Sequence, residues 1–286
     1  MKRKILRSYC KINLFLDVGK KIKKHRLHNI QSLIFLIDLH DKITIQKNNS
    51  LKDKVSFSGK FKSYIKNKNN SITKSLSLLR KNKLIKANDN YSIAVEKNIP
   101  VFSGFGGGSS NAATVIKHFI KGKKISTKYI NYFCKFLGSD LRLFFGYKKI
   151  FQKNLFEINE FKQKHTFYFI LVYPLIKSST KNIYSNLRTF KRLTNKNNYS
   201  GGSKLKIIDN LKFEENSLEK IVVSNFPVVK KVLYELELIK NCQFSRVTGS
   251  GSACFGLFTT KTSANLGLRK IKKKFPKFWC VVGKTI

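Results

Sequence analysis

The sequence is poor in acidic residues: 15 Asp and Glu stand against 58 Lys and Arg in 286 residues, giving a formal net charge of +43. Such a charge points to a nucleic acid or another anionic surface as a partner. However, the basic residues are spread along the chain, and no aromatic-interleaved RNA-binding motif is present. Lys, Asn, Ile and Phe are abundant and Pro is scarce, as expected of an A/T-rich coding sequence. We therefore favour a compositional origin, expect no specific nucleic-acid partner, and note that a positive field attracts phosphorylated substrates.

Paired cysteines, metal-binding patterns and long apolar runs are also absent. The five cysteines are scattered without C-x-x-C spacing, which argues against a zinc site or a disulfide framework and fits a reducing cytosol. The five His form no metal-binding pattern, so we expect no protein-held metal centre. The longest apolar run, which starts at Phe167, is too short to cross a bilayer, and Asn13 and Asp17 interrupt the only candidate signal core. These absences predict a cytoplasmic protein without a membrane segment.

The stretch SGFGGGSSNAATVIKHF, from Ser103 to Phe119, contains four glycines in five positions. Apolar residues recur after the glycines at the spacing of one helix face, and Ser109 or Ser110 is expected to cap the first turn. Glycines before a helix leave backbone N–H groups open to an anion, which the helix dipole also favours. The alternative is a flexible Gly/Ser linker. We favour the anion site because apolar sequence flanks the glycines on both sides.

Two common phosphate motifs do not fit this loop. A Walker loop requires Lys followed by Ser or Thr after its last Gly, and here Ser109 and Ser110 follow. The dinucleotide fingerprint fails as well, because Ser109 stands where the third Gly is needed. The loop therefore belongs to another class of nucleotide binder, if it is one.

The remaining sequence mixes strands and helices without strict alternation, which favours an α+β fold over a doubly wound one. Residues 8–18 alternate as a strand, with Lys11 and Asn13 on one face. Further strands are expected at 29–38, 42–46, 91–100 and 164–174, and as two strands joined by a glycine turn within 245–258. Helices are expected at 70–81, 127–138 and 225–241, and polar loops at 47–68 and 195–204.

Three motifs in a fixed order carry a family resemblance: KINLFLDV from Lys11, IPVFSGFGGGSSNAAT from Ile99 and SRVTGSGSACFGLF from Ser245, with GSDLRLFF between the last two. Together they resemble the GHMP superfamily of small-molecule kinases. KINLFL, LHNIQSLIFLIDLHDKITI and SSTKNIY narrow the resemblance to the 4-diphosphocytidyl-2-C-methyl-D-erythritol kinase family. The resemblance covers nearly the whole chain. It implies an N-terminal α+β domain (residues 1–155) that bears the ATP loop and a C-terminal ferredoxin-like domain (residues 156–286).

The activity that the resemblance implies is ATP-dependent phosphorylation of the 2-hydroxyl of 4-diphosphocytidyl-2-C-methyl-D-erythritol, in the non-mevalonate route to isoprenoid precursors. ATP is the expected phosphoryl donor, Mg²⁺ is expected with it, and the protein is expected to be a monomer or a weak homodimer. Asp140 takes the place of the base that accepts the hydroxyl proton. Lys11 takes the place of its partner, which stabilises charge on the attacking oxygen and the γ-phosphate. On spacing alone, Asp140 is also compatible with a helix-end carboxylate and Lys11 with a solvated strand lysine.

The binding residues follow from the same resemblance. The nucleotide is expected at Asn70, near the adenine, and along the loop made by Pro100, Val101, Phe102, Ser103, Gly104, Phe105, Gly106, Gly107, Gly108, Ser109 and Ser110. The alcohol substrate is expected at Asn13, His28, Thr180, Tyr184, Thr248, Gly249 and Ser250. His28 and Tyr184 also fit ordinary core or turn positions.

The chain departs from the family pattern in ways that bear on both ligands. Leu27, within the segment 24–28, replaces a Tyr that stacks on cytosine, and Phe102-Ser103 replaces small residues of the loop. Two other functions stay open: another GHMP kinase, for homoserine, galactose or mevalonate, and a basic RNA-associated protein without catalysis. The first is disfavoured by SSTKNIY and KINLFL. The second predicts tight, salt-sensitive polynucleotide binding and no nucleotide turnover.

Overall fold

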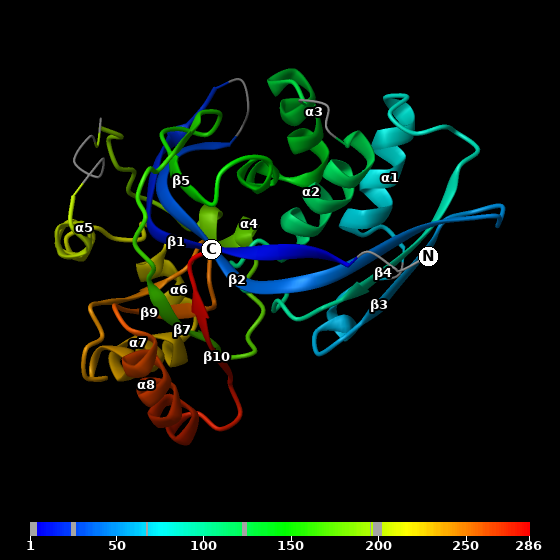
Figure 1. Ribbon diagram of the computed structural model, residues 1–286. Coiled ribbons are helices and arrows are strands. Elements are labelled where there is room, and N and C mark those ends of the chain that lie inside the picture. Colours follow the sequence, from blue (N-terminus) through cyan, green and yellow to red (C-terminus); the bar gives the residue numbers. More distant parts are fainter. Residues whose placement is uncertain (1–4, 24–26, 67, 122–124, 195, 197–201) are drawn as a thin grey trace. The chain divides into compact units, whose positions relative to one another are not determined.

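The computed structural model in Figure 1 describes residues 5–23, 27–66, 68–121, 125–194, 196 and 202–286. The chain divides into two compact units. Unit 1 comprises Met1–Cys10, Leu39–Val101 and Gly106–Gly146, and unit 2 comprises Lys11–Asp38, Phe102–Phe105 and Tyr147–Ile286. The units interleave along the sequence, so the first two strands each contribute residues to both. A domain boundary between residues 155 and 156 stays a prediction.

Unit 1 is built from strands and a layer of helices. Its strands are β3 (Lys54–Ser58), β4 (Asn90–Glu96) and parts of β1 (Leu6–Lys21) and β2 (His28–Asn48). β4 pairs in antiparallel register with the second half of β2 and in parallel register with β3. The helices are α1 (Ser71–Lys81), α2 (Gly107–Ile120) and α3 (Thr127–Leu137), with short 3₁₀ turns η1 (Lys62–Tyr64) and η2 (Ser139–Phe144). α1 packs against α2 and α3, and η2 packs against the same two helices.

Unit 2 contains the rest of β1 and β2, the short strands β5 (Lys149–Gln152) and β6 (Ile158–Glu160), and a second sheet. That sheet has the order β10-β7-β9-β8, and every neighbouring pair is antiparallel. Its strands are β7 (Tyr168–Tyr173), β8 (Ser245–Val247), β9 (Cys254–Phe258) and β10 (Trp279–Lys284). The helices of the unit are α4 (Thr180–Ser185), α5 (Lys204–Lys212), α6 (Glu219–Asn225), α7 (Pro227–Glu237) and α8 (Lys261–Lys274).

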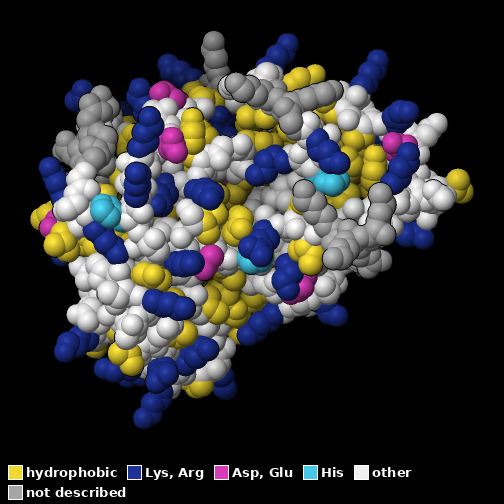
Figure 2. Space-filling view, in the orientation of Figure 1, with side chains coloured by type: hydrophobic (Ala, Val, Ile, Leu, Met, Phe, Trp, Pro, Cys, Tyr) yellow, Lys and Arg dark blue, Asp and Glu magenta, His cyan; other side chains and the backbone are white. Residues whose placement is uncertain are grey.

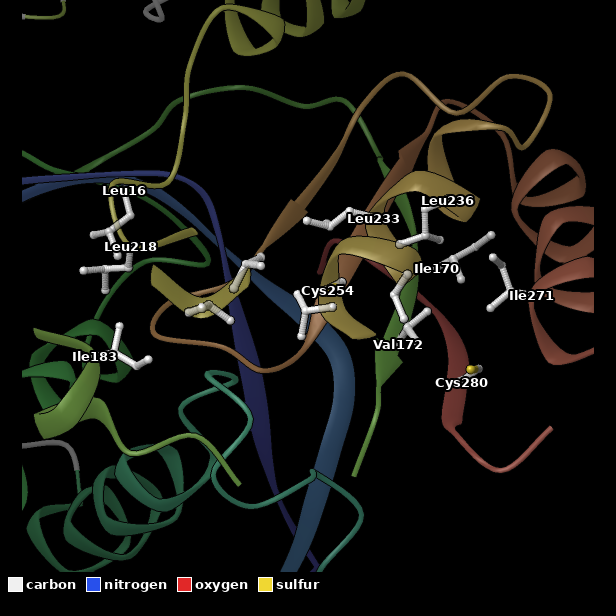
Figure 3. Close-up of a cluster of buried hydrophobic side chains, with 14 of the residues drawn as sticks. Leu16, Ile170, Val172, Ile183, Leu218, Leu233, Leu236, Cys254, Ile271 and Cys280 are labelled. Carbon is white, nitrogen blue, oxygen red and sulfur yellow. The ribbon is translucent and has the colours of Figure 1, made fainter. Parts of the chain in front are cut away.

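The second sheet has the connectivity of a ferredoxin-like domain. α7 lies in the chain between β7 and β8, α8 lies between β9 and β10, and both helices pack on the sheet. Alternate residues of the strands and the inner faces of the helices form one apolar core (Figure 3). The predicted α+β class and the ferredoxin-like C-terminal domain are thus confirmed.

Several predicted boundaries differ from the observed ones. The two strands expected at 29–38 and 42–46 are one continuous strand, β2, because the carboxylate of Asp41 between them is buried and ion-paired instead of marking a turn. The polar stretch 47–68, expected as loop, contains β3 and η1. Most of the loop expected at 195–204 lies outside the described residues.

Within the described ranges, no helix combines the length and apolar character needed to cross a membrane. Lys and Arg side chains are scattered over the face shown in Figure 2, interspersed with apolar and uncharged polar groups. This distribution agrees with the spread of basic residues along the sequence.

Candidate functional site

The glycine loop of unit 1 leads directly into a helix. Gly106 is the N-cap of α2 in a left-handed conformation (φ 72°), and its carbonyl accepts the Ser110 N–H at 2.9 Å. The prediction that Ser109 or Ser110 caps the helix is wrong, because α2 begins before them, at Gly107. Ser110 is buried instead, and its hydroxyl accepts a hydrogen bond from Ser8 of β1 at 2.7 Å. Since Gly106 has no side chain to cap α2, the first-turn N–H groups can serve an anion.

Asp140 lies in unit 1 beside this helix start. It occupies the first turn of η2, which packs against α2, and its side chain is half-buried. Gly138 separates α3 from η2 with φ 99°, and a Cβ there would come within 4.0 Å of the Ser109 hydroxyl. The structure therefore brings the GSD motif and the Gly-Ser-Ser motif together within one unit.

A buried ion pair that the sequence did not predict holds the backbone just before the glycine loop. Lys97 donates from Nζ to Asp41 Oδ2, and the two side chains are 2% and 0% exposed. The other oxygen, Asp41 Oδ1, accepts the N–H groups of Asn98 at 2.7 Å and Ile99 at 2.9 Å. Burial lowers the pKa of Lys97, and the Asp41 carboxylate acts in the opposite direction. A Cβ at Gly107 would meet Lys97 Nζ at 3.4 Å, so the pair lies directly under the helix start.

In unit 2 the three motifs converge around Lys11. Lys11 is buried on β1, its Nζ donates to Asn13 Oδ1, and its N–H donates to the Phe105 carbonyl at 3.0 Å. The Asn13 N–H donates to the Thr248 hydroxyl at 3.0 Å. A Cβ at Gly249 would lie 3.2 Å from Lys11 Nζ, which leaves no room for a side chain there.

Gly104 joins the glycine loop to the third motif. Its φ is 89°, and a Cβ on it would clash with the Thr248 carbonyl oxygen at 2.1 Å. Gly249, the first glycine of the third motif, also comes close, since its own Cβ would lie 3.1 Å from the Gly104 carbonyl oxygen. Only glycine therefore permits this approach of two backbones.

The SSTKNIY segment lines a cavity of about 340 Å³ in unit 2. Ser178 Oγ donates to the Ser250 carbonyl at 2.7 Å, and the hydroxyls of Thr180 and Ser250 are 2.9 Å apart. Phe102 accepts the Ser178 N–H at 3.2 Å through its carbonyl and projects a half-exposed ring (51%), with φ 59°. The cavity is lined by Phe102, Gly104, Lys177, Ser178, Ser179, Thr180 and Ser250.

Some residues of the predicted nucleotide loop have side chains that are buried in the protein. Ser103 and Phe105 are buried, and Phe105 packs edge-on against Trp279 with ring centroids 6.1 Å apart. The Ser103 carbonyl accepts the Ala253 N–H at 3.1 Å. The Ser103 hydroxyl also accepts the Phe105 N–H at 3.5 Å, so both side chains make these contacts within unit 2. Pro100 is also buried, whereas Val101 is half-buried and Gly108 is exposed.

An aromatic group surrounds His28 in unit 2. The buried imidazole lies with Nδ1 3.0 Å from the Gly19 carbonyl oxygen. Its ring stacks on Phe190 (centroids 5.2 Å apart, 21° between planes) and tilts against Tyr184 (5.6 Å, 33°). Phe190, 40% exposed, was missed from the sequence, where the only signal is an aromatic residue six positions after Tyr184. Leu27 is exposed, and residues 24–26 lie outside the described ranges.

Two predicted roles stay predictions. Asn70 is the N-cap of α1 in a capping box, accepting the N–H groups of Ile72 and Thr73, so a structural role is visible and an adenine contact is not tested. Lys11 and Asp140 belong to different units, and their expected pairing is likewise untested.

Comparisons with known proteins agree with this geometry. The family model of the GHMP kinases N terminal domain matches residues 70–139, and that of the GHMP kinases C terminal matches residues 175–277. A 4-diphosphocytidyl-2-C-methyl-D-erythritol kinase from Pelagibacter ubique (strain HTCC1062) is 36% identical over 98% of both chains. The enzyme of the same name from Anaplasma marginale (strain Florida) is 30% identical over 94% of this chain and 92% of its own.

Solved structures share the fold. A crystal structure of 4-(cytidine 5'-diphospho)-2C-methyl-D-erythritol kinase matches with a TM-score of 0.72 and 20% identity, covering 99% of this chain and all of the other. A homoserine kinase from Cytophaga hutchinsonii matches with a TM-score of 0.66 and 14% identity, covering 100% of this chain and 96% of its own. The motifs lie together as described, and a curated relative is 36% identical over 98% of both chains. The chain therefore belongs to the 4-diphosphocytidyl-2-C-methyl-D-erythritol kinase family of the GHMP kinases.

Proposed function

We propose that this chain transfers the γ-phosphoryl group of ATP to the 2-hydroxyl of 4-diphosphocytidyl-2-C-methyl-D-erythritol, giving the 2-phosphate and ADP in non-mevalonate isoprenoid precursor biosynthesis. The observation that carries the proposal is the convergence of Lys11, Gly104 and Gly249, one residue from each motif, within unit 2. The names of the curated relatives support the choice of substrate. The scattered cysteines, without C-x-x-C spacing, fit a cytoplasmic location.

The residues divide the chemistry between charge stabilisation and proton transfer. Phosphoryl transfer depends on alignment and electrostatics more than on covalent catalysis. The N–H groups at the start of α2 bind phosphate oxygens, and the Lys11 ammonium stabilises charge on the attacking oxygen. Asp140 accepts the hydroxyl proton as the new O–P bond forms and the bond to the β-phosphate oxygen breaks.

Mg²⁺ is compatible with this site without a dedicated protein cage. The described residues contain no group of three or more His, Cys, Asp or Glu that could hold a metal ion. Mg²⁺ commonly keeps several waters and binds substrate phosphates together with only one or two protein groups. The Ser109 hydroxyl, half-buried at the helix start, is the group we expect nearest to it. The ion would neutralise phosphate charge during transfer.

A coupled ADP-release assay on the purified protein tests the proposal. The panel is 4-diphosphocytidyl-2-C-methyl-D-erythritol, homoserine, galactose and mevalonate, each with ATP and Mg²⁺. We expect kcat/KM for the diphosphocytidyl alcohol to exceed that for the other three by at least about a thousandfold, because a site built to bind a polar group rejects substrates that lack it. Preferred turnover of another alcohol would replace the proposed substrate. No turnover, together with tight polynucleotide binding, would favour the non-catalytic alternative.

The aromatic group around His28 predicts where the cytosine lies. Stacking on an aromatic ring contributes roughly 1–3 kcal/mol per base. We expect Tyr184→Ala to weaken substrate binding more than about tenfold, and Phe190→Ala to weaken it by a similar factor if its half-exposed ring supplies the second wall. Leu27→Tyr is expected to tighten binding about severalfold, because apolar burial by Leu recovers only part of the stacking energy. Calorimetric titration with the substrate measures all three.

The control for this series is Phe213→Ala, which removes an aromatic side chain that is 90% exposed at the end of α5 in the same unit. Its substrate affinity should equal that of the parent, and no variant of the series should change ATP affinity more than about twofold if the pocket is specific to the base. Parental substrate affinity in Tyr184→Ala would place the cytosine elsewhere and remove the main support for diphosphocytidyl specificity.

A further inference from the structure

One short segment of unit 2, which contains Asn216 and Glu219, hydrogen-bonds both backbone groups of Val247. Val247 directly precedes the glycine turn of the third motif. Glu219 Oε2 accepts the Val247 N–H at 2.7 Å, and Asn216 Nδ2 donates to the Val247 carbonyl at 2.9 Å. The same amide nitrogen donates to the Gly249 carbonyl at 2.8 Å. Asn216 is only 4% exposed. The first residues of the turn are therefore fixed from outside by side chains that belong to neither of its strands.

The amide of Asn216 is suited to this task because both its donor N–H groups and its oxygen are hydrogen-bonded. Its two N–H groups serve the two carbonyls, and its Oδ1 accepts the Leu218 N–H at 3.0 Å. The backbone carbonyl of Asn216 accepts the Glu219 N–H at 2.8 Å, where α6 begins. This local turn orients both side chains toward Val247.

The same segment is also tied to β1, the strand that carries Lys11. The Leu16 N–H donates to the Glu215 carbonyl at 3.0 Å, and the Ser217 N–H donates to the Leu16 carbonyl at 2.8 Å. The Ser217 hydroxyl accepts the Val18 N–H at 3.1 Å. Leu16 and Leu218 belong to one buried cluster, which Figure 3 shows. Residues 215–219 thus set the position of the glycine turn relative to β1.

The opposite side of the turn faces Lys11 and Asn13 of β1. Thr248 accepts the Asn13 N–H through its hydroxyl, and Gly249 comes so close to Lys11 that a Cβ would lie 3.2 Å from Nζ. The Asn216 side chain contacts the Gly249 carbonyl but is not among the groups that line the cavity. A shift of the turn would change the surroundings of the Lys11 ammonium directly.

We propose that Asn216 and Glu219 are positioning residues for phosphoryl transfer, which hold the Thr248–Gly249 turn at the distance from β1 that keeps the Lys11 ammonium aligned. This inference rests on the proposed function. A purely structural role would lower stability and leave kcat unchanged. A positioning role lowers kcat, because small displacements of a catalytic group are costly even when binding is preserved.

The test compares isosteric variants in the ADP-release assay. Asn216→Asp keeps the Oδ1 acceptor and removes both donors, and we expect kcat to fall about tenfold or more with the KM for ATP changed less than about threefold. The matched control is Ser245→Ala on β8, whose hydroxyl bonds the Leu233 carbonyl and Glu237 Oε1, both at 3.1 Å, away from the turn. Its kcat should stay within about twofold of the parent. An unchanged kcat in folded Asn216→Asp overturns the proposal.

A second pair of variants, both at Glu219, keeps the proposal testable if Asn216→Asp does not fold. Glu219→Gln retains an acceptor for the Val247 N–H, whereas Glu219→Met has none, so Gln should recover most of the kcat that Met loses. Equal kcat in the two variants overturns the assignment of Glu219.

If the parent releases no ADP with any alcohol, the proposed function fails, and hydrogen exchange of residues 245–254 decides the inference instead. Faster exchange at the turn in Asn216→Asp than in Ser245→Ala would support the geometric part of the inference, that Asn216 holds the turn, while its role in phosphoryl transfer falls with the proposed function. Equal exchange overturns the inference altogether.

Discussion

Replacing Asp140 by Asn or Lys11 by Met is expected to lower kcat by roughly a hundredfold or more, because in the proposed mechanism each change removes a general base or a charge that acts in the transition state. Asn keeps the shape of the half-buried Asp140 side chain but does not accept a proton. Met keeps the apolar stem of Lys11 on β1 but lacks the ammonium that donates to Asn13. ATP affinity should change much less, since neither residue belongs to the helix start that we propose as the phosphate-binding element. Steady-state ADP release and calorimetric ATP titration measure the two effects.

Each of these variants has a control of the same chemistry away from the site. Lys20→Met changes an exposed lysine of the same strand, β1, and Asp209→Asn changes an exposed aspartate of α5. Both controls should turn over within about twofold of the parent, because surface changes away from special features have small effects. Near-normal kcat in Lys11→Met or Asp140→Asn would remove that residue from the mechanism.

The sequence predicted the parts of this molecule that depend on local pattern. The alternation around Lys11 indicates a strand, and the helical spacing after Gly108 indicates α2, since both periods are properties of neighbouring residues. The glycine at 104 indicated an anion-binding loop, and the glycine at 249 indicated a turn between two strands. Their spacing did not reveal that they approach each other, because that contact depends on how β1, the loop and β8 are placed in three dimensions.

The parts that were missed depend on partners distant in the sequence. In the sequence alone Asp41 suggests a turn, because its ion-pair partner, Lys97, lies 56 positions later in the chain. Asn216 lies 33 positions from the Gly249 carbonyl that it holds. The N-cap of α2 was placed three to four residues late, at Ser109 or Ser110 instead of Gly106. A serine near a helix start suggests a cap, whereas a left-handed glycine N-cap leaves no polar side chain to recognise.

Lys97→Met is expected to lower the free energy of unfolding by about 3–5 kcal/mol, because it leaves the buried Asp41 carboxylate without its counter-charge. The loss reflects the cost of an uncompensated buried charge and is not the net worth of the pair. An exposed pair made by the neighbouring residues provides the control: Lys42 and Glu96 are 3.2 Å apart and their side chains are 45% and 41% exposed. Lys42→Met should cost less than about 1 kcal/mol. Urea unfolding of both variants, followed by far-UV circular dichroism, gives the comparison.

The pH dependence of Asp41→Asn provides a second test of the same pair. Asn keeps an oxygen for the Asn98 and Ile99 N–H groups but removes the charge that raises the pKa of Lys97, so burial alone acts on it and lowers that pKa. A lysine whose pKa is lower in the folded state binds fewer protons there than in the unfolded chain. The stability of the variant should therefore rise as the pH increases from neutral toward the ordinary lysine pKa, and more steeply than that of the parent. A flat profile, or a loss in Lys97→Met no larger than in Lys42→Met, would show that this pair does not behave as a buried charge pair.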